Sequence, residues 1–324
     1  MNAILTIIAK RRKKSVVLVS LTMTMLIMLL FARRVHSFER YDVVVVESSA
    51  FKTYEDVIAG FKSSCNCNVK KIIPLDLYGK QTIDEIYDLK PRIVFAIGEK
   101  ALKYLSSIND LPIIYTMVHD PKPLVDDKKN VIGVTTHIPF EKQLSTIAKI
   151  FTSVKRLGVM YNPKDSIGTA TMNGVLSRAS SLGITLTEGK FHNSRDLISA
   201  VDKMDGNIDA LWLIPDALMT SPELIEYIML YSIKYNVPVF SFTDKHLDLG
   251  ASLVITTAPA DVGIQAGELA SIMVRSGSQP DNLINESNYA TVMINKIVVA
   301  KMSLVIAESF KNRDTLKLDL TKRN

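Results

Sequence analysis

Cysteine is scarce in this chain, which has only two, Cys65 and Cys67, among 324 residues. So few cysteines exclude a disulfide-rich scaffold, and no histidine or second cysteine pair lies near enough to complete a zinc site. A disulfide that encloses a single residue is strained, so the sequence favours two free thiols on a surface loop. A local disulfide is the alternative in an oxidising compartment.

Recognisable catalytic motifs are also missing. The sequence contains no G-x-G-x-x-G, no phosphate-binding G-K-[ST], no H-E-x-x-H and no G-x-S-x-G. The five histidines lack ligand spacing, and we interpret each as a surface or loop residue: His36, His119, His137, His192 and His246. We therefore predict no catalytic residue, no metal and no cofactor, and an enzyme is the least favoured function.

Acidic residues are absent from positions 1–37, which hold seven lysines and arginines. The whole chain carries +6, so the remainder carries −1, and the basic pI of about 9.1 belongs to this leader. Because binding to phosphate groups needs clustered cations, the remainder does not have the charge of a nucleic-acid-binding protein.

The leader has two interpretations. The basic cluster Lys10–Lys14 precedes eighteen uncharged residues, Ser15–Ala32. These residues form either a secretory signal cleaved after Ser37 or an uncleaved anchor in the inner membrane, since eighteen apolar residues are near the minimum for a span. The basic cluster places the N-terminus in the cytoplasm in both cases. We therefore predict that the bulk of the chain is periplasmic or otherwise extracytoplasmic.

Apolar runs of strand length alternate with segments of helical periodicity along the rest of the chain. Ala210–Ile214 and Pro238–Phe242 read as strands, and Ser221–Tyr235 between them has apolar residues at helical spacing. This alternation predicts an α/β fold with parallel sheets, in two successive arrays that form two Rossmann-like lobes. The single tryptophan, Trp212, lies within a predicted strand and is expected in the core.

The long C-terminal portion suggests that the chain crosses between the lobes more than once. The predicted organisation is a leader at 1–37, an N-terminal lobe at 38–135 and 258–280, a C-terminal lobe at 136–257 and 286–310, and a tail at 311–324. Residues 277–288 have the composition of an exposed connector.

Polar residues follow many of the predicted strands, and ligands of parallel sheets bind beyond the carboxyl ends of the strands. Carboxylates there can hold an ammonium group, and helix N-termini can hold a carboxylate. The alternative is that these residues only cap helices or form turns, since Ser, Asp and Asn are preferred N-caps. The candidate ligand-binding residues are Ser48, Ser49, Gly98, Glu99, Asp120, Tyr161, Asn162, Asp165, Ser166 and Asp216.

Several of these segments, in order, resemble ABC transporter substrate-binding proteins of the tryptophan/tyrosine type. The similar segments are Ile93–Gly98, Pro112–Pro121, Asn130–Val134, Glu141–Leu144, Arg156–Pro163, Ile214–Asp216 and Gly250–Leu253, and lastly Ile294-Asn295 with Ala300. The resemblance implies the type I periplasmic-binding fold, with two lobes joined by a multi-strand hinge that close on a small ligand. It also implies delivery to a membrane permease driven by a cytoplasmic ATPase, and it makes Asp120, Asp216, Tyr161 and Asn162 cleft residues.

The sequence departs from that family where Gly98 is followed by Glu99, since the family usually has Gly-Thr there. A carboxylate at this position would repel a ligand carboxylate. Further departures fall at Ile167-Gly168 and Ala258–Ala260. The leading prediction is the extracytoplasmic solute-binding component of an ABC importer that binds an amino acid or a related compound. The alternative is a membrane-anchored sensor or interaction module on the same fold with an altered pocket.

Overall fold

The structure is a computed structural model that describes residues 40–118, 120–164, 168–216, 218–276 and 284–321. The chain divides into two compact units, residues 1–40 and residues 41–324, and the second contains every element below. The predicted leader and the candidates Asp165 and Ser166 lie outside the described residues. None of the helices that are described is long and apolar enough to cross a membrane.

The first sheet has six strands in the order β11-β5-β4-β3-β1-β2, all paired in parallel. Residues Val43–Val46 are wholly buried, which is why this strand reads as a continuous apolar run and does not alternate with polar residues. The strands are β1 (Tyr41–Glu47), β2 (Cys67–Pro74), β3 (Ile93–Ile97), β4 (Ile113–Thr116), β5 (Val131–Val134) and β11 (Ile284–Asn285). We call this sheet and its helices the first lobe.

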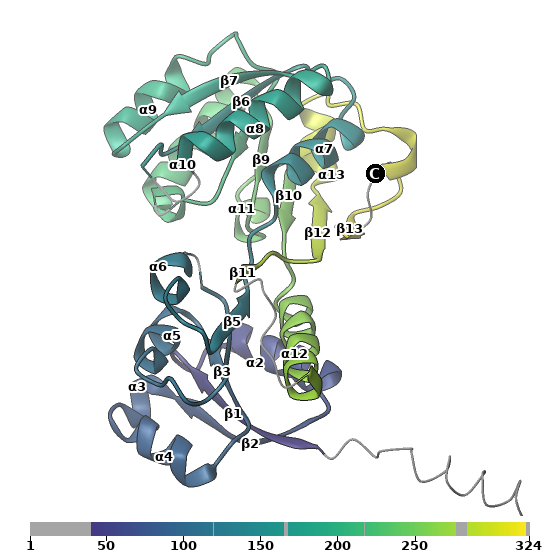
Figure 1. Cartoon of the computed structure of the whole chain (residues 1–324). Coiled ribbons are helices and arrows are strands. Elements are labelled where there is room, and N and C mark those ends of the chain that lie inside the picture. The colour runs from purple at the N-terminus through teal and green to yellow at the C-terminus, as the bar shows by residue number, and fades with distance from the viewer. Residues whose placement is uncertain (1–39, 119, 165–167, 217, 277–283, 322–324) are drawn as a thin grey trace, which may run out of the picture. The chain divides into compact units, whose positions relative to one another are not determined.

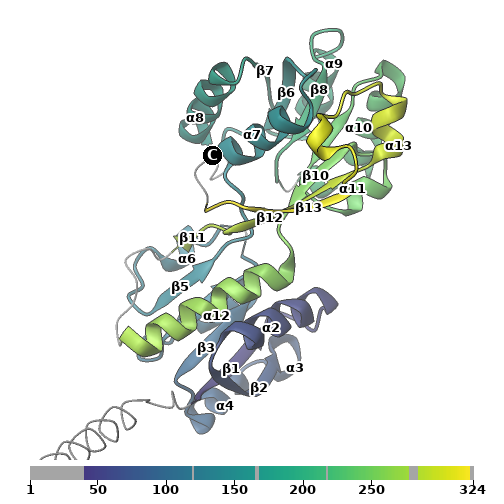
Figure 2. The same ribbon diagram turned by 90° about the vertical axis from the view of Figure 1, so that its right-hand side faces the viewer.

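Helices cover both faces of the first sheet. One face packs against α2 (Lys52–Ser64) and α12 (Pro259–Ser276), which are far apart in sequence but lie side by side (Figures 1 and 2). The other face packs against α4 (Gln81–Leu89), α5 (Glu99–Leu105) and α6 (Lys122–Val125), and α3 (Leu75–Tyr78) follows β2.

The second sheet has seven strands in the order β13-β12-β10-β9-β8-β6-β7. Five of them run parallel, but β12 is antiparallel to β10, and β13 is antiparallel to β12. The predicted α/β fold with parallel sheets is thus confirmed, with two antiparallel strands added at one edge of this sheet. Residues 311–324, predicted as a tail, contain β13. The strands are β6 (Arg156–Tyr161), β7 (Thr185–Lys190), β8 (Ala210–Leu213), β9 (Val239–Ser241), β10 (Leu253–Thr256), β12 (Tyr289–Ile294) and β13 (Thr315–Asp319).

The second lobe also has helices on both faces of its sheet. Trp212 is 1% exposed and packs edge-to-face on Phe140, which confirms its prediction as a core residue. The α-helices are α7 (Phe140–Ile150), α8 (Gly168–Ser181), α9 (Ser194–Asp202), α10 (Pro222–Tyr235), α11 (Lys245–Asp248) and α13 (Lys296–Lys301), with short 3₁₀ turns at Leu218–Thr220 and Glu308–Phe310.

Three segments of backbone connect the sheets: residues 135–139, 257–258 and 286–288. They are hydrogen-bonded to one another or to adjoining residues. The Ser287 N–H donates to the His137 carbonyl (3.4 Å), and the Thr257 hydroxyl donates to the Thr136 carbonyl (3.3 Å). The expected multi-strand hinge is thus present. The last crossing segment begins after β11. This strand pairs with β5 in the first sheet, although it lies within residues 277–288, which the sequence predicts to be an exposed connector.

Cys65 and Cys67 form a disulfide, so the expectation of two free thiols is wrong. Cys65 ends α2 and Cys67 begins β2, and the turn between them brings the two Cα atoms to 5.2 Å. That separation lies within the range that a disulfide spans.

Glycines allow α2 and α12 to approach closely. A methyl group built on Gly263 would lie 2.1 Å from the Val57 carbonyl oxygen, and one on Gly60 would lie 2.0 Å from the Ala260 carbonyl oxygen. Both obstacles are backbone atoms, which cannot rotate away. The return of α12 to the first lobe therefore depends on residues without a side chain.

We expect Gly263→Ala to destabilise the protein by about 1–3 kcal/mol, because the added methyl group forces two helices apart. Thermal unfolding measures this as a fall of several degrees in Tm. Glu268→Ala, at an exposed position of the same helix, is the control and should stay within about 0.5 kcal/mol of the parent. An unchanged Tm in Gly263→Ala would contradict the close packing.

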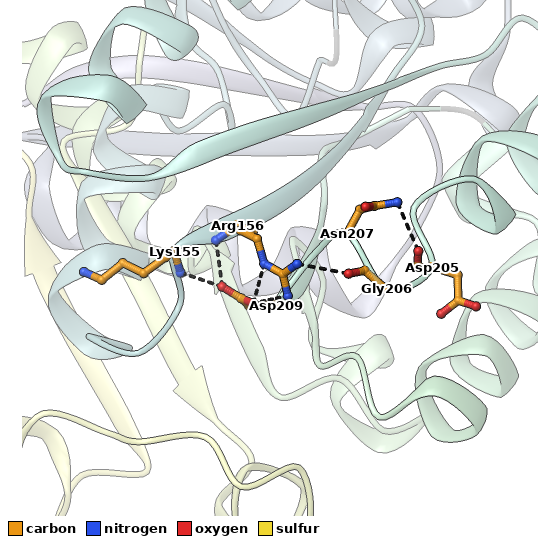
Figure 3. A network of polar contacts seen from close by, with 6 residues as sticks. All are labelled: Lys155, Arg156, Asp205, Gly206, Asn207 and Asp209. Atoms are coloured by element: carbon orange, nitrogen blue, oxygen red, sulfur yellow. Dashed lines mark hydrogen bonds and ion pairs between the residues drawn. The ribbon is translucent and has the colours of Figure 1, made fainter.

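Asp209 ties the starts of β6 and β8 together (Figure 3). Its carboxylate accepts hydrogen bonds from the Lys155 and Arg156 backbone N–H groups at 2.9 and 2.7 Å, and from the Arg156 guanidinium at 2.8 and 3.0 Å. The guanidinium also donates to the Gly206 carbonyl (3.0 Å). Burial by itself would raise the pKa of Asp209, but the backbone and guanidinium donors outweigh it, and the pKa is lowered.

The lowered pKa of Asp209 gives a pH-dependent stability. Its hydrogen bonds stabilise the fold fully above the ordinary pKa of about 3.9, and this contribution is lost as the pH falls through the folded-state pKa. We expect Asp209→Asn to cost about 1 kcal/mol at pH 7, because the side chain is partly exposed. Urea unfolding should show the difference narrowing below about pH 4. Asp205→Asn, in the same loop but exposed, should match the parent at both pH values.

Candidate functional site

A cavity of about 460 Å³ lies at the carboxyl ends of strands from both sheets, against the hinge. This volume is within the range typical of small-molecule sites. The first lobe contributes Asp120, Pro121 and Lys122, which follow β4. Ile284 of β11 also belongs to the first lobe. The remaining walls come from the hinge and the second lobe: Thr135, Thr136, His137, Ile138, Phe140, Gln143, Thr171, Pro215, Phe242, Ile255, Thr256, Thr257 and Glu286.

Charges of both signs meet in this cavity. Asp120 and Glu286 supply carboxylates, and Lys122 supplies an ammonium group. The rings of Phe140 and Phe242 supply apolar walls. A few polar groups on an otherwise apolar lining are typical of sites that orient a small ligand, and opposite charges suit a zwitterion.

The hinge side of the cavity is built by His137 and Gln143. The imidazole Nδ1 of His137 lies 3.4 Å from a Glu286 carboxylate oxygen, and its ring packs edge-on against Phe140 with 4.9 Å between the ring centres. Gln143, in the first turns of α7, is only 3% exposed, and its amide nitrogen donates to the Ile138 carbonyl (2.9 Å). Both side chains are thus held by their neighbours.

Within the described part of the chain, Asp120 is the one candidate predicted from the sequence that lines the cavity. Tyr161 is buried, and its hydroxyl donates to Glu188 on the neighbouring strand (2.5 Å). The Asn162 side chain accepts from the Lys164 N–H (3.0 Å), and Asp216 accepts from the Leu218 N–H (2.7 Å). The bonds of Asn162 and Asp216 are the turn-forming contacts that the alternative interpretation of strand-end residues predicts, whereas the bond of Tyr161 joins two neighbouring strands.

A second group of candidates lies together at the ends of β1 and β3. The Ser48 hydroxyl accepts a hydrogen bond from the Ala101 N–H (3.0 Å) in the first turn of α5. A methyl group on Gly98, which has a φ of +91°, would lie 2.5 Å from both the Ser48 and Tyr54 hydroxyl oxygens. Ser49 is half-buried and Glu99 is exposed. The structure therefore gives Ser48 the role of a helix cap.

Glu47 is an unexpected buried carboxyl at the end of β1, with 6% of its surface exposed. Burial raises its pKa, and the negative charges of Asp76 and Glu55 raise it further. In the sequence, Glu47 is a charged residue that ends a run of valines, a pattern that by itself predicts only the end of a strand. A carboxylate in these surroundings destabilises the folded state at neutral pH.

We expect Glu47→Gln to raise Tm at pH 7 by on the order of 2 °C, because it removes a buried charge. The destabilisation is present above the raised pKa and disappears below the ordinary pKa of about 4.3, so the gain should vanish near pH 4. Melting curves of both proteins at the two pH values measure this. Glu226→Gln, exposed on α10, is the control without a gain. A lower Tm at pH 7 would show that the Glu47 carboxylate is stabilised.

Most of the residues that line the cavity were not among the candidates from the sequence. Six of them lie on the hinge segments, including His137, which the sequence predicts to be an ordinary surface or loop residue. His246, given the same interpretation, is 5% exposed, and its Nδ1 lies 2.6 Å from the Ser241 hydroxyl. Burial, followed by the charge of Lys245, lowers its pKa. The expectation of a surface position is therefore wrong for His246.

No group of three His, Cys, Asp or Glu side chains in the described ranges could hold a metal ion. Residues 78–315 match a family model described as ABC transporter substrate binding protein. The family is one of binding proteins and not of enzymes.

A tyrosine-binding protein of Clostridioides difficile (strain R20291) is 23% identical over 214 residues, which cover 64% of this chain and 61% of that relative. The match therefore spans less than two thirds of the relative's length.

Among solved structures, the ligand-free, open form of CD0873, a substrate-binding protein with adhesive properties from Clostridium difficile, has a TM-score of 0.65 at 18% identity, over 85% of this chain and 97% of that one. An ABC domain from Streptococcus pneumonia in complex with L-Trp has a TM-score of 0.56 at 20% identity, over 83% and 97%. At these identities the similarity establishes the fold, which is that of type I periplasmic binding proteins.

Proposed function

The chain belongs to the family of ABC transporter substrate-binding proteins, and from this premise we propose that it is the extracytoplasmic solute-binding component of an ABC importer. The ligand is an amino acid or a related small compound, held in the cavity at the hinge. The loaded protein then delivers it to a membrane permease whose ATPase partner drives import.

The observation that carries this proposal is that Asp120 and Lys122 both line one cavity against the hinge. Opposite charges beside apolar Phe140 and Phe242 match the ammonium, carboxylate and side chain of an amino acid. A hinge of three crossing segments permits the two lobes to move as units around the ligand.

We further propose that the leader exports the chain, either as a cleaved signal or as an anchor through residues 15–32. N-terminal sequencing of the exported protein distinguishes the two forms. A mature N-terminus at Phe38 would exclude the anchor, and an intact leader in the membrane fraction would establish it.

We expect Asp120→Asn to weaken ligand binding at least about tenfold, because a charge-assisted hydrogen bond becomes a neutral one. The test is a thermal-shift screen of the exported protein with L-tyrosine, L-tryptophan and L-leucine. A ligand at about a hundred times its Kd adds roughly 2.7 kcal/mol to the parent's stability.

Asp88→Asn, exposed on α4 in the same lobe, is the matched control and should respond as the parent does. An equal ligand response in Asp120→Asn and the parent would remove Asp120 from the site. A parent that responds to no solute in a wider panel of amino acids, organic anions and sugars would count against the binding function itself.

A further inference from the structure

An ion pair joins the two lobes beside the hinge. The Lys317 ammonium group on β13, in the second sheet, donates a hydrogen bond to the Asp261 carboxylate (2.5 Å). Asp261 lies in the first turn of α12, which packs on the first lobe. Lys317 lies outside residues 78–315, the part of the chain that matches the family model. Neither residue lines the cavity, so the ion pair does not contact the proposed ligand.

The surroundings of this ion pair hold both charges in place. The Asp261 side chain is only 10% exposed, and the N-terminus of a helix favours a carboxylate. The Lys317 nitrogen lies 4.5 Å from the ring centre of Tyr289, which is a cation–π distance. Because one charge of the pair is buried, separating the two groups costs more than breaking an exposed ion pair does.

The ion pair and the cavity lie on opposite sides of the crossing segment 257–258, which continues β10. In the second sheet, β9 and β8 lie on one side of β10, and Phe242 and Pro215, which follow them, line the cavity. The other side of β10 holds β12 and β13, and β13 carries Lys317. A hinge motion that narrows the cavity on the first side therefore widens the second side, and it draws Lys317 away from Asp261.

We propose that the Lys317–Asp261 ion pair resists closure of the lobes and thereby sets the affinity for the ligand. This inference rests on the proposed solute-binding function and adds to it a contact that regulates closure. In the free protein, the ion pair favours the conformation in which it is intact. A ligand must bind the closed conformation strongly enough to separate the pair, so its apparent affinity is lower than the closed cavity by itself would give.

Lys296 and Asp314 offer a matched comparison. Their ion pair has a similar length, 2.7 Å, but both residues belong to the second lobe, next to β12 and β13. Lys296→Met therefore breaks an ion pair without changing a contact between the lobes. Lys317→Met and Asp261→Asn break the interlobe pair from its two ends, and Lys317→Arg retains the charge.

Spin labels on the two lobes measure closure without a ligand. Lys103→Cys on α5 and Glu226→Cys on α10 place the labels at exposed positions, and the native cysteines do not react because they form a disulfide. The distance between the labels is measured by electron–electron resonance on the full-length chain in detergent. We expect Lys317→Met and Asp261→Asn to add a population at shorter distances, whereas Lys317→Arg and Lys296→Met should match the parent.

Isothermal titration of the unlabelled chain with tyrosine, tryptophan and leucine measures the affinity. We expect Lys317→Met and Asp261→Asn to bind an amino acid about threefold to tenfold more tightly than the parent, because closure no longer separates the ion pair. Lys296→Met should bind as the parent does. Melting curves establish that each variant is folded.

Unchanged label distances in both variants that break the interlobe pair would overturn the proposal, as would an equal change in Lys296→Met. Unchanged or weaker binding of an amino acid by both folded variants would also overturn it, but would leave the solute-binding function standing. A parent that binds no solute would instead count against that function, and the label distances would still decide whether the ion pair resists closure.

Discussion

Hydrogen bonds between the backbone segments that cross from one sheet to the other hold the site together. The Ser287 N–H donates to the His137 carbonyl, and the Thr135 N–H donates to the Asn285 carbonyl, so distant parts of the chain are aligned beside one another. The residues they carry form the hinge side of the cavity. Because the same segments join the lobes and line the cavity, a ligand that contacts them acts directly on the geometry of the hinge.

The crossing pattern depends in turn on α12. This helix follows β10 of the second sheet but packs on α2 of the first lobe, where Gly60 and Gly263 let the two backbones approach. Its buried Gln265 then bonds to the backbone of the last crossing segment at Glu286 and Asn288. The helix therefore positions both a core surface and a hinge segment, which couples the packing of the first lobe to the wall of the cavity.

The polar groups at the two ends of the second sheet differ in how completely they are hydrogen-bonded. At the start of β6 and β8, Asp209 and Arg156 satisfy each other and the neighbouring backbone, which serves stability. At the carboxyl ends, Gln143 and His137 keep buried atoms that no described residue pairs. Burial of a polar atom without a partner costs free energy. The two ends of the second sheet therefore differ in how completely the described residues pair their buried polar groups.

The sequence by itself determined the α/β class and placed most strands, because strands that are buried on both faces of a sheet appear in the sequence as continuous apolar runs. β8 and β9 lie within the apolar runs Ala210–Ile214 and Pro238–Phe242 that the sequence predicts as strands. The same sequence did not reveal β12, β13 or the short β11, since the first two gain their partners only after the chain has returned to the second sheet, and β11 is two residues long. The family resemblance led correctly to a binding protein. Asp120 was among the candidates that line the cavity because it lies beyond the end of a predicted strand. His137 and Glu286 were not among the candidates, because nothing in their local sequence separates them from ordinary loop residues. Gln143 lies in Glu141–Leu144, one of the segments that resemble the family, but was not singled out within it. Only the tertiary structure, by bringing three crossing segments together, decides which of these polar groups come to line one cavity.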